Sequence, residues 1–386
     1  MKIGLVAPFF LPDIGGANVY CYELAKALAR RGHEVHVFAR PGALADPAYI
    51  LHPVLTLNLA TDLSVLAAEK MDVWHSLFFF HAALALIKRN TFITGHGDDF
   101  FSLRVRCTIP GRAWLQRHVF WRLPSRVCAA LEAAFARTEK GLTWMITWLG
   151  ALRARRLVAV STFSSARAAG FYPMTRRRFE VIPPGVSDRF FQVSSRERDR
   201  FNLLTVSRLD DEDRIKNVHG VITALGRLKD RFDFRYRIVG GTVRGRYRDE
   251  LDELIADLGL REQVTIEGRK TDEELIACYE RAGLFILCSY AERRNFEGFG
   301  IVFLEANASG VPVLTTSDGG MRDYVLEGVN GLYAKDGSPE AIRAALERYL
   351  RGELAFDTAR IRQAPERYRW HRIAELVESM YLRYSH

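Results

Sequence analysis

The order of apolar and polar positions along the chain predicts two successive series of alternating strands and helices. In the first half, strands are expected where short apolar runs occur, at 2–6, 33–38, 71–74, 91–94 and 157–160. The rhythm restarts near residue 200, with strands expected at 201–206, 234–239, 264–266, 284–288 and 311–315. Helical spacing predicts helices over 18–31, 218–228, 248–258, 272–281 and 301–308. Strands separated by helices are typical of α/β folds with parallel sheets.

The length of 386 residues suits two domains rather than one, and 48% hydrophobic residues are enough for two sizeable cores. Prolines and a glycine interrupt the pattern over 181–186, which indicates a linker. We therefore expect a Rossmann-like domain over 1–182 and a second over 183–365. Residues 366–386 carry apolar side chains at helical spacing and predict a terminal amphipathic helix.

The formal net charge of +9 indicates an anionic partner, such as nucleic acid, anionic lipid or a phosphorylated substrate. Nucleic acid is not expected, because the chain lacks the motifs of its common binding folds. The five cysteines lack metal-ligand spacing and are interpreted as free thiols in a reducing compartment. The chain opens on strand-like text and has no run of about 20 apolar residues. A cytoplasmic location is therefore expected, with the inner face of the cell membrane as an extension of it.

The most informative segment holds two glutamates, Glu297 and Glu305, with a Gly-Phe-Gly turn directly after the first. The apolar run 301–304 predicts a helix, with the first acid on the preceding loop and the second about two turns along. The amides of the first helical turn would then face a ligand of the loop. This arrangement suits a sugar joined to a phosphate, although the spacing alone is also typical of a helix with two solvated acids.

The pattern continues beyond this segment with Gly310-Val-Pro-Val313, Gly319-Gly320 and Gly328-Val-Asn-Gly331. The chain thereby resembles the retaining glycosyltransferases of family 4, also called glycosyl transferases group 1. The resemblance implies the GT-B fold, in which two Rossmann-like, doubly wound domains face a central cleft and a C-terminal helix crosses back to the first domain. It spans nearly the whole chain and weakens over 100–156.

The resemblance also implies roles for particular residues. Arg208 and Lys216, after a predicted strand, would bind the donor diphosphate and stabilise it as it leaves. His96 would contact the donor sugar from the first domain, and the expected catalytic residues are His96, Arg208, Lys216 and Glu297. The remaining expected donor-binding residues are Gly15, Gly16, Phe299, Gly300, Ile301 and Glu305, the last beside the ribose.

Plainer interpretations stand beside these roles. Surface cations, a flexible glycine loop and a structural histidine are common features of proteins. The acidic run 210–213 departs from the family pattern, which makes Arg214 a second candidate for the role of Lys216. That run is too irregular to predict a Mg²⁺ site, so neither metal nor cofactor is expected.

The activity implied is transfer of a sugar from a UDP- or GDP-linked donor to an acceptor hydroxyl, with retained anomeric configuration. The expected acceptor is a lipid-linked saccharide or another glycan of a surface polysaccharide. Residues 103–156 combine arginines with tryptophans, including Trp121, and are interpreted either as a contact with anionic membrane or as packed helix. Two alternatives remain: a sugar-nucleotide epimerase of GT-B architecture, and a non-catalytic, membrane-associated scaffold that binds sugar nucleotides.

Overall fold

The computed structural model describes residues 1–13, 15–108, 112–120, 125–193, 198–241 and 245–385. The chain divides into two compact units. Unit 1 consists of Met1–Ala159, Ser165–Ile182 and Ala374–His386, and unit 2 consists of Val160–Ser164 and Pro183–Ile373. Trp121, which contributes to the tryptophan-rich pattern of the sequence, lies outside the described residues.

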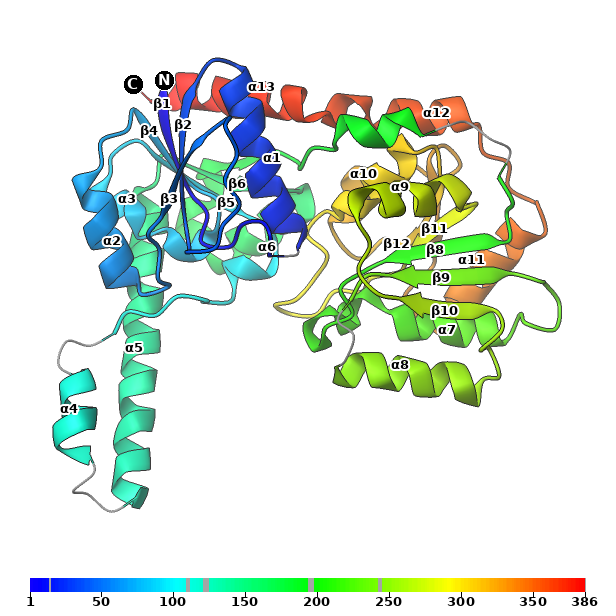
Figure 1. Cartoon of the computed structure of the whole chain (residues 1–386), viewed down its shortest axis with the longest axis horizontal. Coiled ribbons are helices and arrows are strands. Elements are labelled where there is room, and N and C mark those ends of the chain that lie inside the picture. The colour runs from blue at the N-terminus through cyan, green and yellow to red at the C-terminus, as the bar shows by residue number, and fades with distance from the viewer. Residues whose placement is uncertain (14, 109–111, 121–124, 194–197, 242–244, 386) are drawn as a thin grey trace. The chain divides into compact units, whose positions relative to one another are not determined.

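Unit 1 is built on a seven-stranded sheet in the order β3-β2-β1-β4-β5-β6-β7, with every pair parallel (Figure 1). Its strands are β1 (Lys2–Val6), β2 (Glu34–Ala39), β3 (Ile50–Pro53), β4 (Val73–Ser76), β5 (Thr91–Gly95), β6 (Arg156–Ala159) and β7 (Phe179–Val181). Its helices are α1 (Gly16–Arg30), α2 (Leu59–Ala68), α3 (Leu84–Ile87), α4 (Arg112–His118) and α5 (Ser125–Arg153), and α6 (Thr162–Phe171) follows β6.

Unit 2 repeats the architecture with a six-stranded parallel sheet in the order β10-β9-β8-β11-β12-β13. Its strands are β8 (Asn202–Val206), β9 (Arg235–Val239), β10 (Val264–Glu267), β11 (Leu284–Leu287), β12 (Val313–Thr316) and β13 (Gly331–Ala334). Its helices are α7 (Val218–Gly226), α8 (Arg246–Asp257), α9 (Asp272–Arg281), α10 (Ile301–Ala308), α11 (Pro339–Leu350) and α12 (Thr358–Gln363).

The two predicted doubly wound sheets are therefore confirmed. Every residue of β4, β5, β11 and β12 is buried, which explains why none of these strands shows the apolar–polar alternation of a half-buried strand. In each sheet the strand order reverses once, between β1 and β4 in unit 1 and between β8 and β11 in unit 2. Such a reversal is where open α/β sheets bind ligands, at the carboxyl ends of the strands.

Three strands were not predicted, and all three are edge strands: β3, β7 and β13. Each is only three or four residues long, and two of them contain a polar or charged residue that breaks the apolar run. The strand predicted over 71–74 is observed two residues later, as β4 over Val73–Ser76. An edge strand has one hydrogen-bonded neighbour and needs less apolar surface, so its sequence signal is weak.

The last helix, α13 (Trp370–Tyr384), contributes its residues from Ala374 onward to unit 1. The hydroxyl of Tyr381 lies 2.6 Å from Nδ1 of the buried His75 on β4. Glu378 accepts hydrogen bonds from the guanidinium of Arg31, directly after α1. These contacts attach the end of the chain to the first sheet.

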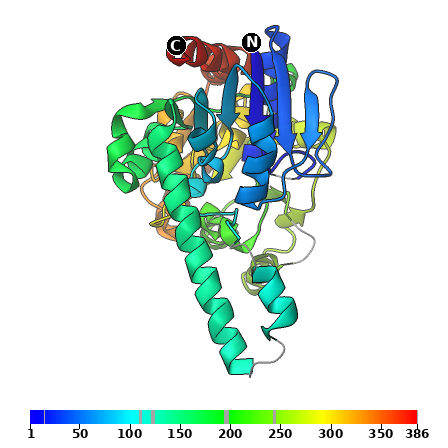
Figure 2. The ribbon, with the colours of Figure 1, turned by 90° about the vertical axis from the view of Figure 1, so that its left-hand side faces the viewer.

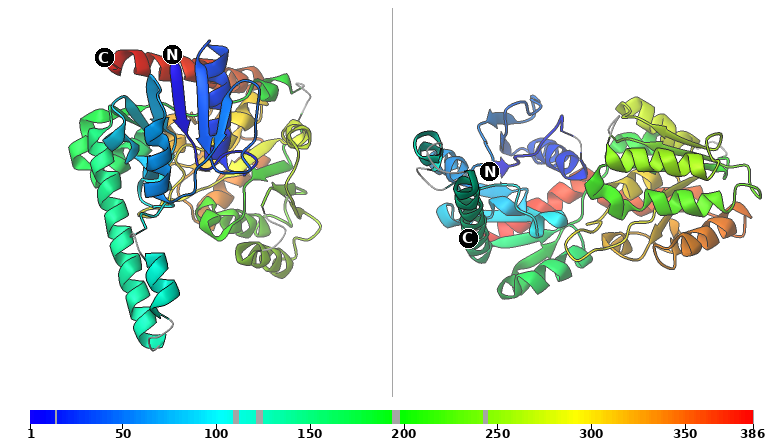
Figure 3. Two further views of the ribbon diagram at one scale, coloured as in Figure 1. Left: turned by 60° about the vertical axis from the view of Figure 1, so that its left-hand side comes forward. Right: turned by 90° about the horizontal axis from the view of Figure 1, so that it is seen from below.

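In the segment over 103–156, interpreted as membrane contact or packed helix, the described residues include two helices that lie side by side. The 29-residue α5 and the shorter α4 project together beyond the sheet of unit 1 (Figures 1, 2 and 3). The C-terminal part of α5 packs on α3. Among the described residues, no helix is long and apolar enough to cross a membrane.

Candidate active site

The predicted donor-binding residues of unit 2 follow the two strands that flank its switch point. Arg208 is the second residue after β8, and Lys216 ends the 3₁₀ helix η6 (Asp211–Lys216) that follows. Glu297 lies on the loop between β11 and α10. Because β8 and β11 are hydrogen-bonded neighbours, their carboxyl ends lie at one edge of the sheet.

Asp213, a buried carboxylate that was not predicted as a site residue, holds the two cations together. Its Oδ1 lies 3.2 Å from Nη2 of Arg208 and 3.4 Å from Nζ of Lys216. Burial disfavours the charge, but the two cations outweigh this and hold the pKa of Asp213 below its usual value. The buried carboxylate of Asp213 therefore positions the partly exposed cations of Arg208 and Lys216 side by side, as binding of a diphosphate would require.

The loop that carries these residues is fastened to the neighbouring strands. Asn217 adopts a left-handed conformation, with φ of 59°, between η6 and α7. Its side-chain amide donates to the carbonyl oxygens of Cys288, 3.1 Å away, and Gly337, 2.7 Å away. The amide of Tyr290 donates to Ile215 O at 2.9 Å. The position of Lys216 is thereby fixed by contacts with the end of β11.

Arg214, the second candidate for the role of Lys216, has a different partner. Its guanidinium donates to Glu250 on α8 and lies over the ring of Tyr247. Lys216, and not Arg214, therefore shares Asp213 with Arg208.

Two further glycines approach this loop closely and were not predicted. Gly240 and Gly241 follow β9 with φ of 104° and 85°. A Cβ atom would lie 2.5 Å from Ser207 O at the first and 2.6 Å from Arg208 O at the second. The chain after β9 can therefore lie this close to the backbone of Arg208 only because both residues are glycines. A glycine pair directly after a predicted strand was the signal available in the sequence.

The loop that carries Glu297 is closed by the glycines after β12. The amide of Gly320 donates to Glu297 O at 2.9 Å, and a Cβ on Gly320 would lie 1.8 Å from Gly298 O. The hydroxyl of Ser164 donates to the same Gly298 carbonyl at 3.1 Å. The predicted motif residues Gly319-Gly320 therefore serve to hold the backbone beside the first glutamate.

The start of α10 has the expected geometry. Gly300 has φ of 84°, and a Cβ there would lie 2.5 Å from the ring of Phe303. Ile301 is the first helical residue, and no side chain caps the helix. The Phe299 side chain is buried against Tyr324 and Tyr368, which anchors the turn. The Phe303 amide donates to Gly300 O at 3.0 Å, so the amides of Ile301 and Val302 are the ones in this turn that a ligand of the loop could bind.

The second glutamate, Glu305, lies in a different environment from the half-buried Glu297. It is 8% exposed and accepts a hydrogen bond from the Tyr279 hydroxyl at 3.0 Å. Burial raises the pKa of Glu305 to about 7. Its expected role beside the ribose stays a prediction.

In unit 1, Gly15 and Gly16 open α1 after the loop that follows β1. Gly15 is the N-cap residue, and its carbonyl accepts from the amides of Asn18 and Val19 at 3.0 Å and 3.1 Å. No side chain caps this 15-residue helix. Its N-terminus therefore has the positive end of a helix dipole available for an anion.

His96 follows β5 and is fixed in orientation and charge. Its Nε2 lies 2.9 Å from Leu77 O, and since a carbonyl can only accept, Nε2 carries the proton and Nδ1 is left as an acceptor. Burial lowers the pKa of His96 to about 4, so the ring is neutral near pH 7. The buried Asp99 accepts from the His96 and Gly97 amides at 2.7 Å and 3.0 Å.

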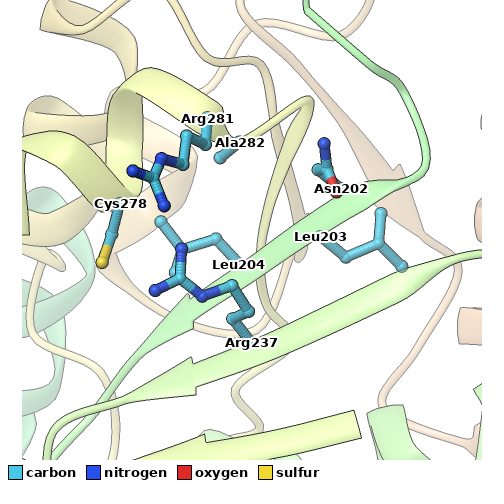
Figure 4. A pocket seen from close by; sticks show the side chains of 7 residues that line it. All are labelled: Asn202, Leu203, Leu204, Arg237, Cys278, Arg281 and Ala282. Carbon is cyan, nitrogen blue, oxygen red and sulfur yellow. The ribbon is translucent and has the colours of Figure 1, made fainter. Parts of the chain in front are cut away.

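A pocket of about 300 Å³ lies elsewhere in unit 2 (Figure 4). It is lined by Asn202, Leu203, Leu204, Arg237, Cys278, Arg281 and Ala282. These residues belong to β8, to β9, to α9 and to its C-cap Ala282, and none of them is a predicted site residue. Arg237 is held in a bidentate pair with Glu267.

Comparisons with known proteins show the family to which the chain belongs and the fold that it shares. A family model described as Glycosyl transferases group 1 matches residues 186–367, and one described as Glycosyltransferase Family 4 matches residues 14–190. A D-inositol 3-phosphate glycosyltransferase from Nocardia farcinica is 30% identical over 353 residues, which cover 84% of this chain and 74% of the relative.

Two solved structures show the same fold at low identity. Sucrose-phosphate synthase from Thermosynechococcus elongatus has a TM-score of 0.70 at 19% identity, covering 99% of this chain and 98% of that one. HepE from Anabaena, in complex with UDP-glucose, has a TM-score of 0.69 at 18% identity, covering 99% and 100%. With both halves matched by family models, the chain belongs to the glycosyl transferases of group 1, family 4, and is a glycosyltransferase of the GT-B fold.

Proposed function

We propose that the protein transfers a sugar from a UDP- or GDP-linked donor to an acceptor hydroxyl with retention of the anomeric configuration. The observation that carries this proposal is the pair of cations, Arg208 and Lys216, held on the buried Asp213 at the carboxyl end of β8. Two adjacent positive charges at a switch point suit a diphosphate, the leaving group of a nucleotide sugar. The HepE structure was solved with UDP-glucose, which supports a nucleotide sugar as the ligand.

The reaction breaks the bond between the sugar C1 and the diphosphate oxygen and forms a bond from C1 to the acceptor oxygen. The two cations would stabilise the negative charge that develops on the departing diphosphate. The acceptor proton would pass to an oxygen of that diphosphate on the same face of the sugar, which retains the configuration. This route does not use a protein side chain as the base, and neither metal nor cofactor is expected to take part.

Other residues would position the donor. The amides at the start of α10, from Gly300 and Ile301, would bind phosphate or sugar oxygens, with Glu297 beside them for sugar hydroxyls. Glu305 would contact the ribose from α10. On unit 1, Nδ1 of His96 would accept from a sugar hydroxyl, and Gly15 and Gly16 would allow close approach at the start of α1.

The acceptor proposed is a lipid-linked saccharide or a surface polysaccharide, and an assay of product separates this function from an epimerase. Release of nucleoside diphosphate that depends on acceptor supports a transferase, whereas interconversion of the donor without acceptor would indicate an epimerase. The proton coupling constant at C1 of the isolated product reports whether the configuration is retained.

The first test of the proposal is a thermal shift with UDP, GDP and ADP, each with and without EDTA. A ligand that binds only the folded state stabilises it by about 2.7 kcal/mol at 100 times Kd. We expect a shift from UDP or GDP that EDTA does not change and that Arg208→Ala reduces. Arg235→Ala, at the opposite end of the sheet, is the matched control and should keep the shift. No shift from any nucleotide would contradict the donor proposal.

A further inference from the structure

A continuous apolar stripe runs along the exposed side of α5. Its large members are Val127, Leu131, Met145 and Leu149, which are 43%, 36%, 52% and 41% exposed. At 3.6 residues per turn, these four lie within about 40° of one another around the helix axis. The distance along the axis from Val127 to Met145 is about 27 Å, at 1.5 Å per residue.

The positions between them keep the stripe apolar. Ala134 and Thr138 fall on the same side of the helix and are exposed. The Thr138 hydroxyl donates to Ala134 O at 2.9 Å, so the polar atom is satisfied by the helix itself and its methyl group remains. We call Val127, Leu131, Ala134, Thr138, Met145 and Leu149 the α5 stripe.

Within the part of unit 1 that the structure describes, neither α4 nor any other element covers the α5 stripe. The α4 segment packs on another side of α5, where Glu139 pairs with Arg112 and the Phe135 ring lies 6.3 Å from that of Phe120. The sheet side is marked by Gly150, where a Cβ would lie 2.2 Å from Ala82 O. The distal half of α5, with α4 beside it, extends away from the sheet (Figure 2).

Further exposed apolar side chains lie on the segment beside the C-terminal end of α5. The 3₁₀ helix η4 (Pro173–Arg178) is attached there, because the Arg178 guanidinium donates to Leu152 O and Ala154 O. Met174 on η4 is 71% exposed. Phe171, 42% exposed, lies 5.7 Å from the ring of Trp144 on α5.

Charge decides which partner fits this surface. Among the described residues of α4, α5 and η4, one exposed acid, Glu132, stands against the exposed cations Arg117, Arg126, Arg137, Lys140, Arg153, Arg176 and Arg177. A second copy of the chain would bring like charges together, whereas an anionic lipid surface is complementary. Trp114 on α4 is 59% exposed, and tryptophan is enriched at lipid–water interfaces.

We infer that the α5 stripe is a membrane-docking surface that lies in the interface of an anionic bilayer, with flanking arginines such as Arg126 and Arg137 contacting lipid phosphates. Long basic helices with one apolar side bind in the plane of such an interface rather than across it. The inference goes beyond the proposed function, because it concerns a surface of unit 1 that holds no predicted donor-binding residue. A glycosyltransferase anchored in this way would work on acceptors at the lipid surface.

Flotation of the full chain with vesicles tests the inference without nucleotide or acceptor. Vesicles are made of phosphatidylcholine alone or with about one-third phosphatidylglycerol. We expect the protein to float with the anionic vesicles at low salt, not with the neutral ones, and to be released as salt is raised.

Two variant sets separate the apolar and charged contributions. The first is a triple variant that combines Leu131→Gln, Met145→Gln and Leu149→Gln. It should lower binding to anionic vesicles about tenfold or more. The matched control is Leu376→Gln with Leu382→Gln on α13, which are 49% and 54% exposed.

For charge, Arg126→Gln with Arg137→Gln should lower binding about tenfold at low salt. The matched control is Arg261→Gln with Arg269→Gln, which removes the same net charge from exposed positions of unit 2. Both control sets should float like the wild type.

Several results would overturn the inference: absence of flotation, equal flotation with neutral vesicles, or the same loss in the control sets. Sedimentation equilibrium showing a dimer that the triple glutamine variant dissociates would also overturn it, since a second copy would then cover the stripe. The triple variant should keep its helix content by circular dichroism and the nucleotide-dependent thermal shift of the wild type. A failure of membrane docking is thereby distinguished from a failure of the donor proposal.

Discussion

Replacement of Asp213 by asparagine should weaken binding of the donor nucleotide. The amide retains an oxygen that can accept from Arg208 but has no charge to hold Arg208 and Lys216 together. The two cations lie 3.2 Å and 3.4 Å from one carboxylate oxygen, so their nitrogens are at most about 6.6 Å apart. Without the carboxylate, they repel each other and lose their fixed geometry.

The size of the effect follows from these distances. At an effective dielectric constant of about 20, two unit charges 6.6 Å apart repel by about 2.5 kcal/mol. The Arg208 and Lys216 side chains are 37% and 21% exposed, and solvent screening reduces this to about 1–2 kcal/mol. Since 1.4 kcal/mol is a factor of ten, the Kd for UDP or GDP should rise about tenfold.

A second electrostatic effect of the substitution acts on the binding free energy in the opposite direction. The Asp213 carboxylate repels the incoming diphosphate, so loss of its charge alone would favour binding. That repulsion is the weaker term if the cations stand between the carboxylate and the ligand, as the proposed mode of binding requires. Isothermal titration with UDP and GDP measures which term dominates.

Glu212→Gln is the control for Asp213→Asn, because it removes one exposed charge from the same 3₁₀ helix. Glu212→Gln should leave Kd within about twofold of the wild type, the scale of a screened surface charge. Tighter binding by Asp213→Asn, with its fold intact by circular dichroism, would refute the reasoning that Asp213 acts by positioning the cations.

Three further predictions concern other parts of the site. Burial raises the pKa of Glu305 from the ordinary 4.5 to about 7, so its ionisation opposes folding and wild-type stability falls as pH rises between these values. Glu305→Gln can still accept from Tyr279 but cannot ionise. Its free energy of unfolding in urea, relative to that of the wild type, should therefore rise by up to about 3 kcal/mol between pH 5 and pH 8. A difference in free energy that is the same at both pH values would contradict this. His96→Asn should lower the transfer rate about tenfold to a hundredfold, the scale of one hydrogen bond to substrate. Burial lowers the pKa of His96 to about 4, so the ring should stay neutral throughout the assay range. An inflection of the transfer rate between pH 6 and pH 7 that disappears in His96→Asn would refute a neutral role. Gly320→Ala should lower stability by about 2 kcal/mol or more, because its Cβ would lie 1.8 Å from a carbonyl oxygen, whereas Gly268→Ala has open space and should leave Tm unchanged.

The sequence predicted the central strands of both sheets because those strands are buried on both faces. The run that became β11 is apolar throughout, and its four residues are buried. Of the four edge strands, β10 was predicted, whereas β3, β7 and β13 escaped prediction, because pairing with one neighbour places little demand on the side chains of such short strands. The direction in which α5 projects from unit 1 could not be predicted either, since helical periodicity does not tell which side of a helix remains uncovered.

Residues of the candidate site were predictable where a motif placed them at a strand end. Arg208 and Glu297 were found in this way, because the ends of neighbouring parallel strands must meet. Gly240 and Gly241 were missed, since only the fold shows that the end of β9 lies too close to the backbone of Ser207 and Arg208 for a Cβ atom. The burial of Glu305 against Tyr279 was hidden too, because it depends on how α9 and α10 pack.

The acidic run 210–213 shows most clearly why a loop's chemistry does not follow from its composition. In the sequence alone its four acids are equivalent, and they mark a departure from the family pattern. In the fold, Asp211 accepts from the Tyr247 amide at 3.1 Å near the start of α8, and Asp213 turns inward to bind both cations. The acids are therefore divided between attaching the loop and organising its charge. A departure from the family pattern thus supplies the anion that holds the two cations of the proposed donor site together.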